Sequence, residues 1–334
     1  MKAFRMEAAG VAGVAEVPEV APKDGEVLLQ VKMVGMCGTD LSTFRGRNAM
    51  VTFPRVLGHE VAAVVVEGSG DLPVGTAVTV SPYTSCGICP SCRRGRVNAC
   101  QRNETMGVQR DGAMTEYISV PREKLYVANL SLKELCLVEP LTVGFHAVAR
   151  GRVEMKDAVA VFGCGAIGLG AIAGSAFRGA ETIAIDMDDA KLAIARKAGA
   201  THTINTSREN LHARLAEITG GQGPDVTIEA IGLPTTFRAA VKEVAFTGRV
   251  VYIGYAKEEV SYDTRLFVQK ELDIMGSRNA LPEDFREVIH MLEAKRFPVE
   301  DAVSAIVPME DAAQILGEWS EQPAKFTKIL VEIA

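Results

Sequence analysis

Four cysteines lie close together in the stretch SCGICPSCRRGRVNACQ, residues 85–101, with the spacing C-x2-C-x2-C-x7-C. They are Cys86, Cys89, Cys92 and Cys100. Four thiolates make a closed tetrahedral zinc site that leaves no coordination position for a substrate. The chain has seven cysteines in 334 residues and no visible export signal, so a disulfide framework is disfavoured. The spacing therefore predicts a bound zinc ion that holds this segment together.

A second set of possible ligands is dispersed along the chain. Cys37 lies in GMCGTD, His59 and Glu60 lie in LGHEV, and Glu139 lies in the apolar segment CLVEPLTVGF. A single cysteine or histidine is most often a packing residue, but a glutamate in an apolar segment is costly unless it is paired or bound to metal. One thiolate, one imidazole and one or two carboxylates could form an open zinc site with room for a substrate oxygen.

A glycine-rich turn follows the apolar run AVAVF. It reads Gly163-Cys164-Gly165-Ala166-Ile167-Gly168, with the pattern G-x-G-x-x-G between a buried strand and a helix. In this setting the glycines permit a tight turn, close approach of a pyrophosphate and close helix packing. Asp186 ends the next strand, where a carboxylate accepts the ribose hydroxyls and repels a 2′-phosphate. The turn predicts a dinucleotide site that prefers NAD to NADP.

Composition excludes several other classes of protein. A net charge of −6 gives no general attraction to nucleic acid or anionic membranes. Residues 158–177 carry no charge and are long enough to span a membrane, but their five glycines favour a strand, turn and helix. The arginines of the cysteine segment, Arg93, Arg94 and Arg96, are then expected in a solvated or subunit-contact patch.

Hydrophobic periodicity indicates how these residues are positioned. Val27, Leu29, Val31 and Met33 alternate with polar residues, which predicts a half-buried strand in a β-rich first part. Ser131 and Glu134 have capping-box spacing and predict a helix start. From about residue 157, apolar runs alternate with helical segments, the pattern of a parallel sheet with crossover helices. The last fifty or so residues are expected to complete the first domain.

These motifs together resemble the zinc-dependent medium-chain dehydrogenases, the group of alcohol, sorbitol and threonine dehydrogenases. The resemblance rests on GMCGTD, PRVLGHEV, the four-cysteine segment, DGAMTEYISVP, VEPLTVGFHA, VFGCGAIGLG and IEAIG, and it covers nearly the whole chain. It implies an α/β protein with a GroES-like β-rich catalytic domain, residues 1–144 and 281–334. A Rossmann NAD-binding domain, residues 145–280, would be inserted into it.

The resemblance also implies roles for individual residues. Cys37, His59, Glu60 and Glu139 match the positions around the catalytic zinc, and the four-cysteine segment matches the structural zinc lobe. Thr39 matches the hydroxyl that passes on the substrate proton. Many members have a histidine three residues after this hydroxyl, where this chain has Ser42. The proton is therefore expected to leave through a ribose hydroxyl and water. Besides the glycine turn and Asp186, the cofactor is expected to contact Ile231 and Gly254.

Within the family, RGRNAMVTFPRVLGHE and MGSRNALPEDF resemble bacterial dehydrogenases that act at C5 of hexonates such as L-galactonate or L-gulonate. Arg278, Arg45 and Arg47 are the candidate partners of a substrate carboxylate. A polyol or L-threonine dehydrogenase is the alternative, and a non-enzymatic NAD-binding regulator is a further one. The expected protein is a cytoplasmic homodimer or homotetramer with a small-molecule substrate, two zinc ions per chain, and no nucleic acid or membrane partner.

Overall fold

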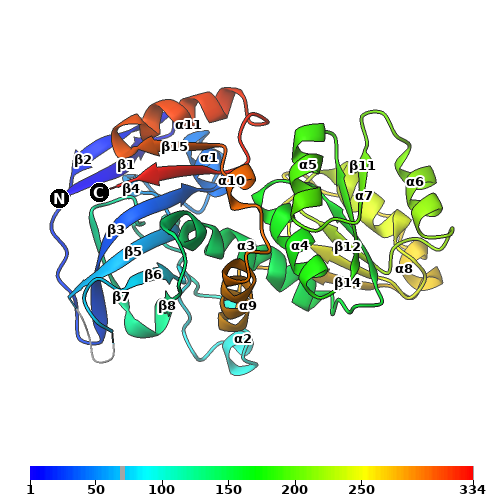
Figure 1. Ribbon diagram of the computed structural model, residues 1–334, viewed down its shortest axis with the longest axis horizontal. Coiled ribbons are helices and arrows are strands. Elements are labelled where there is room, and N and C mark those ends of the chain that lie inside the picture. Colours follow the sequence, from blue (N-terminus) through cyan, green and yellow to red (C-terminus); the bar gives the residue numbers. More distant parts are fainter. Residues whose placement is uncertain (68–71, 334) are drawn as a thin grey trace. The chain divides into compact units, whose positions relative to one another are not determined.

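The computed structural model describes residues 1–67 and 72–333, which form two compact units. One comprises Met1–Glu139 and Val299–Ala334, and the other comprises Pro140–Pro298. Both ends of the chain therefore belong to the first unit, as the blue and red segments of Figure 1 show. The second unit is a continuous insertion between them.

The first unit is built mainly from antiparallel strands. Its larger sheet has the order β15-β16-β3-β5-β6-β8, with β7 also paired to β3, and a smaller sheet has the order β2-β1-β4. Its strands are β1 (Lys2–Ala8), β2 (Val11–Glu16), β3 (Glu26–Met36), β4 (Arg55–Val56), β5 (Glu60–Glu67), β6 (Ala77–Val80), β7 (Tyr117–Pro121), β8 (Leu125–Val127), β15 (Ala305–Pro308) and β16 (Ile329–Glu332). Its helices are α1 (Gly38–Phe44), α2 (Pro90–Arg93), α10 (Val299–Ala302) and α11 (Ala312–Glu321), with 3-10 turns at Val97–Ala99, Arg122–Lys124 and Met309–Asp311.

Strand β3 is the centre of this sheet. Its even alternation from Val27 to Met33 gives a buried side chain at every second position, as the sequence predicted. Strand β16, from the end of the chain, pairs with β3 so that Ile329 lies opposite Met36 and Val331 opposite Val34. On its other side β3 pairs with β5, with Gly35 opposite Glu60. Three segments far apart in sequence therefore meet where β3 ends.

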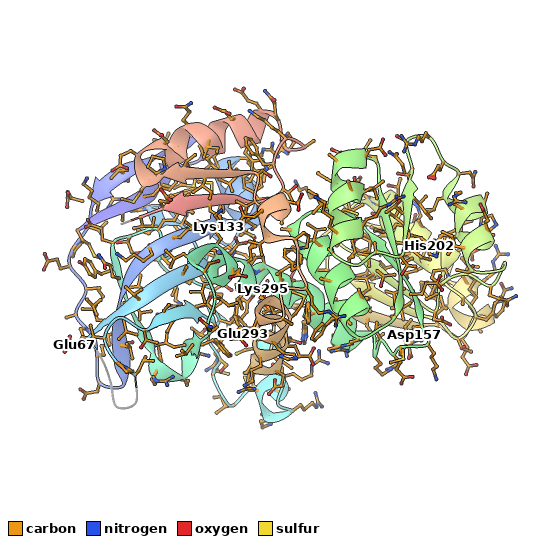
Figure 2. All side chains as sticks on the ribbon, viewed as in Figure 1. Glu67, Lys133, Asp157, His202, Glu293 and Lys295 are labelled. Carbon is orange, nitrogen blue, oxygen red and sulfur yellow. The ribbon has the colours of Figure 1, made fainter. Side chains whose placement is uncertain are left out.

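The second unit has a parallel sheet of order β11-β10-β9-β12-β13-β14. Its strands are β9 (Ala158–Phe162), β10 (Glu181–Asp186), β11 (His202–Asn205), β12 (Val226–Glu229), β13 (Arg249–Tyr252) and β14 (Asp273–Gly276). Its helices are α4 (Ala166–Phe177), α5 (Asp189–Lys197), α6 (Leu211–Ile218), α7 (Pro234–Glu243), α8 (Arg265–Gln269) and α9 (Pro282–Glu293). Asp157, labelled in Figure 2, precedes β9 and pairs with Arg249 of β13 at 2.7 Å. Strands β10 and β11 are added on one side of β9, and β12 to β14 on the other. The strand order thus reverses between β9 and β12, which is where parallel sheets of this kind bind ligands.

The units divide at residues 139/140 and 298/299, whereas the sequence placed the boundaries at 144/145 and 280/281. Helix α3 (Leu132–Arg150) begins at the predicted capping box, with Ser131 and Glu134 bonded to one another, and Pro140 lies inside it at the division. Helix α9 accounts for the second difference. Asp284 of α9 bonds His146, and Glu287 bonds Arg178, so this helix packs on α3 and α4 of the inserted unit.

Residues 158–177 form a strand, a turn and helix α4, as their glycines indicated. Within the described parts of the chain, we find no helix with the length and apolar character needed to cross a membrane.

Candidate active site and metal centres

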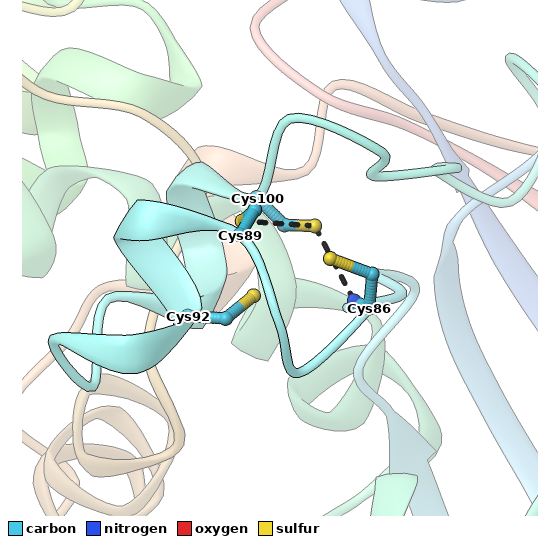
Figure 3. A group of neighbouring side chains, drawn as sticks. All are labelled: Cys86, Cys89, Cys92 and Cys100. Atoms are coloured by element: carbon cyan, nitrogen blue, oxygen red, sulfur yellow. Dashed lines mark hydrogen bonds between the residues drawn. The ribbon is translucent and has the colours of Figure 1, made fainter.

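The four-cysteine segment folds into a small lobe with the thiol groups gathered at its centre (Figure 3). The sulfur atoms all lie within 4.8 Å of one another, and Cys89 Sγ is 3.9 Å from Cys100 Sγ. A tetrahedron with zinc–sulfur bonds of about 2.3 Å has edges of about 3.8 Å, so this donor set fits a zinc ion. Gly87 and Gly95 have φ of 73° and 74°, a backbone conformation that favours glycine and lets the chain turn tightly between the cysteines.

Local hydrogen bonds prepare some of these thiols for a cation. Contacts from Ser91 and the Cys92 backbone amide lower the pKa of Cys89 to about 5, and the backbone amides of Cys86 and Arg102 donate to Cys100 Sγ. Burial raises the pKa of Cys92 to about 11. The lobe therefore offers at least one thiolate at neutral pH, and a bound cation would favour ionisation of the rest.

The second cluster lies where β3, β5 and β16 meet. Cys37 directly follows β3 and caps helix α1, while His59 and Glu60 lead into β5. One ligand atom from each of these three residues lies within 4.8 Å of the others. His59 and Glu60 are buried, and Cys37 is half-buried. Sulfur, nitrogen and oxygen donors in this arrangement fit a zinc site with an open position.

Glu139 lies near this cluster, buried in helix α3. Its charge adds to the pKa shifts of His59 and Glu60, and its Oε1 accepts a hydrogen bond from Tyr83. Burial and the Glu139 charge raise the pKa of Tyr83 well above its ordinary value, so the phenol remains a donor. The structure thus places Glu139 as a second carboxylate beside the cluster, held by a tyrosine that motif reasoning missed.

Opposing charges dominate the electrostatics. Burial lowers the pKa of His59, but Cys37, Asp40 and Glu139 together outweigh this effect, so the pKa rises well above the ordinary value. Burial raises the pKa of Glu60 to about 7 in spite of the adjacent Lys328 ammonium. Both pKa shifts arise because acidic side chains are buried close together, where water solvates them poorly. A divalent cation would offset their mutual repulsion, which is a further reason that the residues fit a metal.

Two further buried residues support the ligands. Lys328 Nζ lies 2.6 Å from both oxygens of Glu60 and donates to the Met36 carbonyl at 3.0 Å. Asp40 Oδ2 accepts the Cys37 backbone N–H at 2.8 Å, and its charge acts on His59. Sequence reasoning missed both. A lysine in the otherwise apolar FTKILVEI and the aspartate of GMCGTD were the available signals.

Thr39 lies on the first turn of α1, beside the cluster. Its Oγ1 is 3.7 Å from Cys37 Sγ, so the hydroxyl adjoins one of the candidate metal ligands. Ser42 lies one turn further along the same helix and is half-buried. Ser42 thus places a hydroxyl where many zinc-dependent medium-chain dehydrogenases have the imidazole of a histidine.

The glycine turn has the geometry expected of a phosphate site. Gly163 has a φ of 98°, and a Cβ at Gly168 would lie 1.8 Å from the Gly163 carbonyl oxygen. A Cβ at Gly165 would meet nothing within 4 Å, so this residue faces open space at the start of α4. The first backbone amides of the helix have no intrahelical acceptor and can bind a phosphate.

Asp186 ties the glycine turn to the end of β10. Its Oδ2 accepts the backbone N–H of Cys164 at 2.8 Å, and its Oδ1 accepts those of Met187 and Asp188 at 2.7 and 3.1 Å. The carboxylate is therefore fixed at the edge of the sheet. Its unused lone pairs are the acceptors that a ribose diol would need.

Glu229, in the IEAIG motif, brings the other two expected cofactor residues together. Its Oε1 accepts the backbone N–H of Ile231 at 2.9 Å and that of Gly232 at 2.8 Å. Its backbone oxygen accepts the N–H of Gly254 at 3.1 Å. One buried glutamate thus organises the loops after β12 and β13, a role that the sequence did not predict.

The three candidate arginines differ in their surroundings. Arg45 is used within the fold, since its Nε donates to Ser320 Oγ at 3.0 Å and its guanidinium also binds the Ser320 carbonyl near the end of α11. Arg47 is exposed in the loop after α1. Arg278 is exposed two residues beyond β14, at the carboxyl edge of the parallel sheet. Arg45 is therefore held by a contact within the first unit.

Comparison with known proteins agrees with this geometry. Residues 23–129 match the alcohol dehydrogenase GroES-like domain, and residues 166–294 match the zinc-binding dehydrogenase family. L-Galactonate-5-dehydrogenase of Escherichia coli K12 is 33% identical over 90% of this chain and 88% of its own. Sorbitol dehydrogenase of Bacillus subtilis is 34% identical over 78% of this chain and 76% of its own. The crystal structure of an alcohol dehydrogenase from Escherichia coli CFT073, complexed with NADH, superposes with a TM-score of 0.91 at 28% identity and covers 99% of both chains.

Proposed function

Because the chain belongs to the zinc-dependent medium-chain dehydrogenases, enzymes that act on CH–OH groups, we propose that it oxidises a secondary alcohol of a sugar acid with NAD. A hexonate oxidised at C5 is the substrate that we favour. The observation that carries the chemistry is the cluster of Cys37, His59 and Glu60 with the Thr39 hydroxyl beside it. Such a site combines metal ligands with a proton carrier.

Each residue has a part in the proposed reaction. Cys37, His59 and one of the two carboxylates, Glu60 or Glu139, would hold zinc, which supplies a Lewis acid that lowers the pKa of the substrate alcohol. Thr39 would accept the alcohol proton and give up its own hydroxyl proton toward the cofactor ribose hydroxyl and water, since a hydroxyl can accept one hydrogen bond while donating another. Asp40 and Tyr83 hold ligands in place from behind, as outer-sphere partners do.

The proposed hydride acceptor is NAD. The amides at the start of α4 would bind the pyrophosphate, and the fixed Asp186 carboxylate would accept the ribose hydroxyls. A 2′-phosphate would meet the same carboxylate and be repelled. Asp186→Asn keeps the shape and one acceptor oxygen, so we expect it to reduce the preference for NAD over NADP. Comparison of kcat/KM for the two cofactors tests this assignment, and a wild type that prefers NADP would refute it.

The substrate class rests on Arg278. This exposed cation follows the carboxyl end of β14, and a guanidinium can bind a carboxylate through two parallel hydrogen bonds. A neutral polyol offers no such partner. The relationship to L-galactonate-5-dehydrogenase supports a sugar acid, while the relationship to sorbitol dehydrogenase makes a polyol the natural competitor.

The deciding experiment measures NADH formation by the zinc-loaded protein with L-galactonate, L-gulonate and polyols of equal chain length. We expect higher kcat/KM for a hexonate. Arg278→Ala should raise the KM for the hexonate about tenfold or more and leave the polyol almost unchanged. Arg286→Ala on α9, an exposed arginine of the same unit paired with Glu283 at 3.6 Å, is the matched control and should change neither. Equal losses on both substrates, or a wild type that prefers the polyol, would reject the carboxylate.

A further inference from the structure

The most heavily buried ion pair of the first unit, among the residues that the structure describes, lies directly beside the proposed catalytic metal. The side chains of Lys328 and Glu60 are 3% and 0% exposed. The ammonium of Lys328 has three N–H donors, and three acceptor atoms surround it: both oxygens of Glu60 at 2.6 Å and the Met36 carbonyl at 3.0 Å. Each N–H of this lysine therefore has an acceptor, and almost none of its side chain reaches solvent.

A second feature shows that the position of Glu60 is specified on its other side. Gly35 lies opposite Glu60 in the pairing of β3 with β5. A Cβ at Gly35 would lie 2.0 Å from Glu60 Oε2, so only glycine leaves room for the carboxylate at this point. The missing side chain of β3 and the ammonium of Lys328 together hold Glu60 in one orientation.

That orientation places Glu60 in two competing interactions. An oxygen of Glu60 is within 4.8 Å of ligand atoms of Cys37 and His59, which is close enough to share a cation with them. Lys328 engages the same carboxylate, because both of its oxygens contact Nζ. Zinc and Lys328 must therefore compete for Glu60, while Glu139 is held separately by Tyr83.

The balance of charge points the same way. Cys37, Glu60 and Glu139 bring three acidic groups to one small region, and a zinc ion would bring only two positive charges. Lys328 supplies positive charge that the metal does not. Without Lys328, an ionised Glu60 would be buried and unpaired, and it would be attracted to the nearest cation. The nearest cation would then be the zinc ion itself.

We propose that Lys328 is a positioning residue that keeps Glu60 from becoming a permanent ligand of the catalytic zinc. By holding the carboxylate, it preserves a coordination position for the substrate oxygen and lets Glu60 approach the metal only transiently. The inference rests on the proposed zinc chemistry of this site. It concerns only which protein atoms bind the metal.

The test compares wild type, Lys328→Met, Glu60→Gln and the double variant Glu60→Gln/Lys328→Met, each loaded with zinc or with cobalt. Methionine keeps the length of the lysine side chain without its charge, and glutamine keeps the shape of Glu60. Cobalt reports coordination through its visible spectrum. Zinc release to a chelator reports lability, and zinc in the four-cysteine lobe of the same molecule serves as an internal reference.

In Lys328→Met we expect the rate of zinc release from the catalytic site to fall at least about tenfold. Changes to outer-sphere residues alter metal binding by this amount. The cobalt spectrum should change as an extra oxygen ligand binds. Neither effect should occur when Lys328→Met is made in the Glu60→Gln background. Release from the lobe should be unchanged throughout.

Two results would overturn the proposal. Faster zinc release from Lys328→Met would mean that the lysine supports metal binding. Equal slowing in the wild-type and Glu60→Gln backgrounds, with an unchanged cobalt spectrum, would reduce its role to charge repulsion of the metal. If Lys328→Met does not fold, the double variant Glu60→Gln/Lys328→Met can be compared with Glu60→Gln alone. The proposal requires these two variants to release zinc at similar rates, so a clear difference between them would overturn it. Wild-type NADH formation tests the dehydrogenase assignment independently, so the two ideas can fail separately.

Discussion

The two metal clusters of the first unit are built in opposite ways. The four-cysteine lobe takes all its ligands from residues 86–100, and short turns and backbone amides arrange them. The cluster of Cys37, His59 and Glu60 draws on β3, α1 and β5, and it depends on Lys328 from the far end of the chain. The lobe contains only thiols, whereas the second cluster mixes three kinds of donor among buried charges.

This difference separates a site that holds structure from one that can react. Four thiolates saturate a zinc ion, so the lobe can contribute folding energy but offers no position for a substrate. The mixed cluster leaves a position open, yet it confines several anions away from water. The acidic groups around this position are therefore held by Asp40, Tyr83 and Lys328, and loss of one of these three residues should alter reactivity more than stability.

The largest expected effect is on turnover. Cys37→Ser should lower kcat/KM about 1,000-fold or more, because it removes a ligand of the metal that polarises the substrate. The protein should remain folded and retain the zinc of the lobe. Activity, circular dichroism and metal content measure this. Cys136→Ser is the matched control, since Cys136 is buried under the same sheet but lies outside the ligand cluster. Full activity in Cys37→Ser would contradict the assignment of this cluster, and not the lobe, as the reactive site.

The next effect is on stability. Cys89→Ser should release the zinc of the lobe and lower the free energy of unfolding by about 3 kcal/mol, which corresponds to a fall in Tm of about 5–10 °C. Ser91→Ala, which removes one hydrogen bond to Cys89 Sγ, should cause a smaller fall. Melting curves and zinc content decide. A variant that lacks this zinc but melts like wild type would show that the lobe does not stabilise the fold.

A third prediction concerns the shape of the reactive cluster. Gly35→Ala should weaken metal binding there about 10- to 100-fold, because the added methyl group displaces the Glu60 carboxylate. Zinc affinity and kcat/KM should fall together while the lobe is unaffected. Gly13→Ala on β2, where a Cβ would meet nothing within 4 Å, is the control and should change neither property.

The smallest effect should come from Tyr83→Phe. It removes the hydrogen bond to Glu139 and leaves the ring in place, so kcat/KM should fall about three- to tenfold with little change in Tm. Tyr117→Phe on β7 tests whether loss of any hydroxyl from this unit has the same result. Unchanged kinetics in Tyr83→Phe would show that Glu139 needs no support.

The sequence by itself determined what local spacing can specify. Cysteine spacing predicted the lobe, the glycine pattern predicted the turn between β9 and α4, and alternation predicted β3. Each of these depends on residues that are neighbours in the chain, so backbone geometry alone brings them together. Donor chemistry alone marked Cys37, His59 and Glu60 as possible ligands of one metal, but it was the resemblance to a known family that assigned them to the catalytic zinc, since no spacing rule joins Cys37 to His59.

Only the tertiary structure decided which supports the ligands have. Strand pairing of β16 with β3 brings Lys328 to Glu60 across 268 residues, and nothing local in FTKILVEI indicates that partner. The same holds for Arg45, which is half-buried and binds Ser320, and for α9, which belongs to the inserted unit. Burial of the apolar faces of the strands fixes their register. Charged side chains that are buried along with them are stable only when they are paired, and their partners can come from distant parts of the chain.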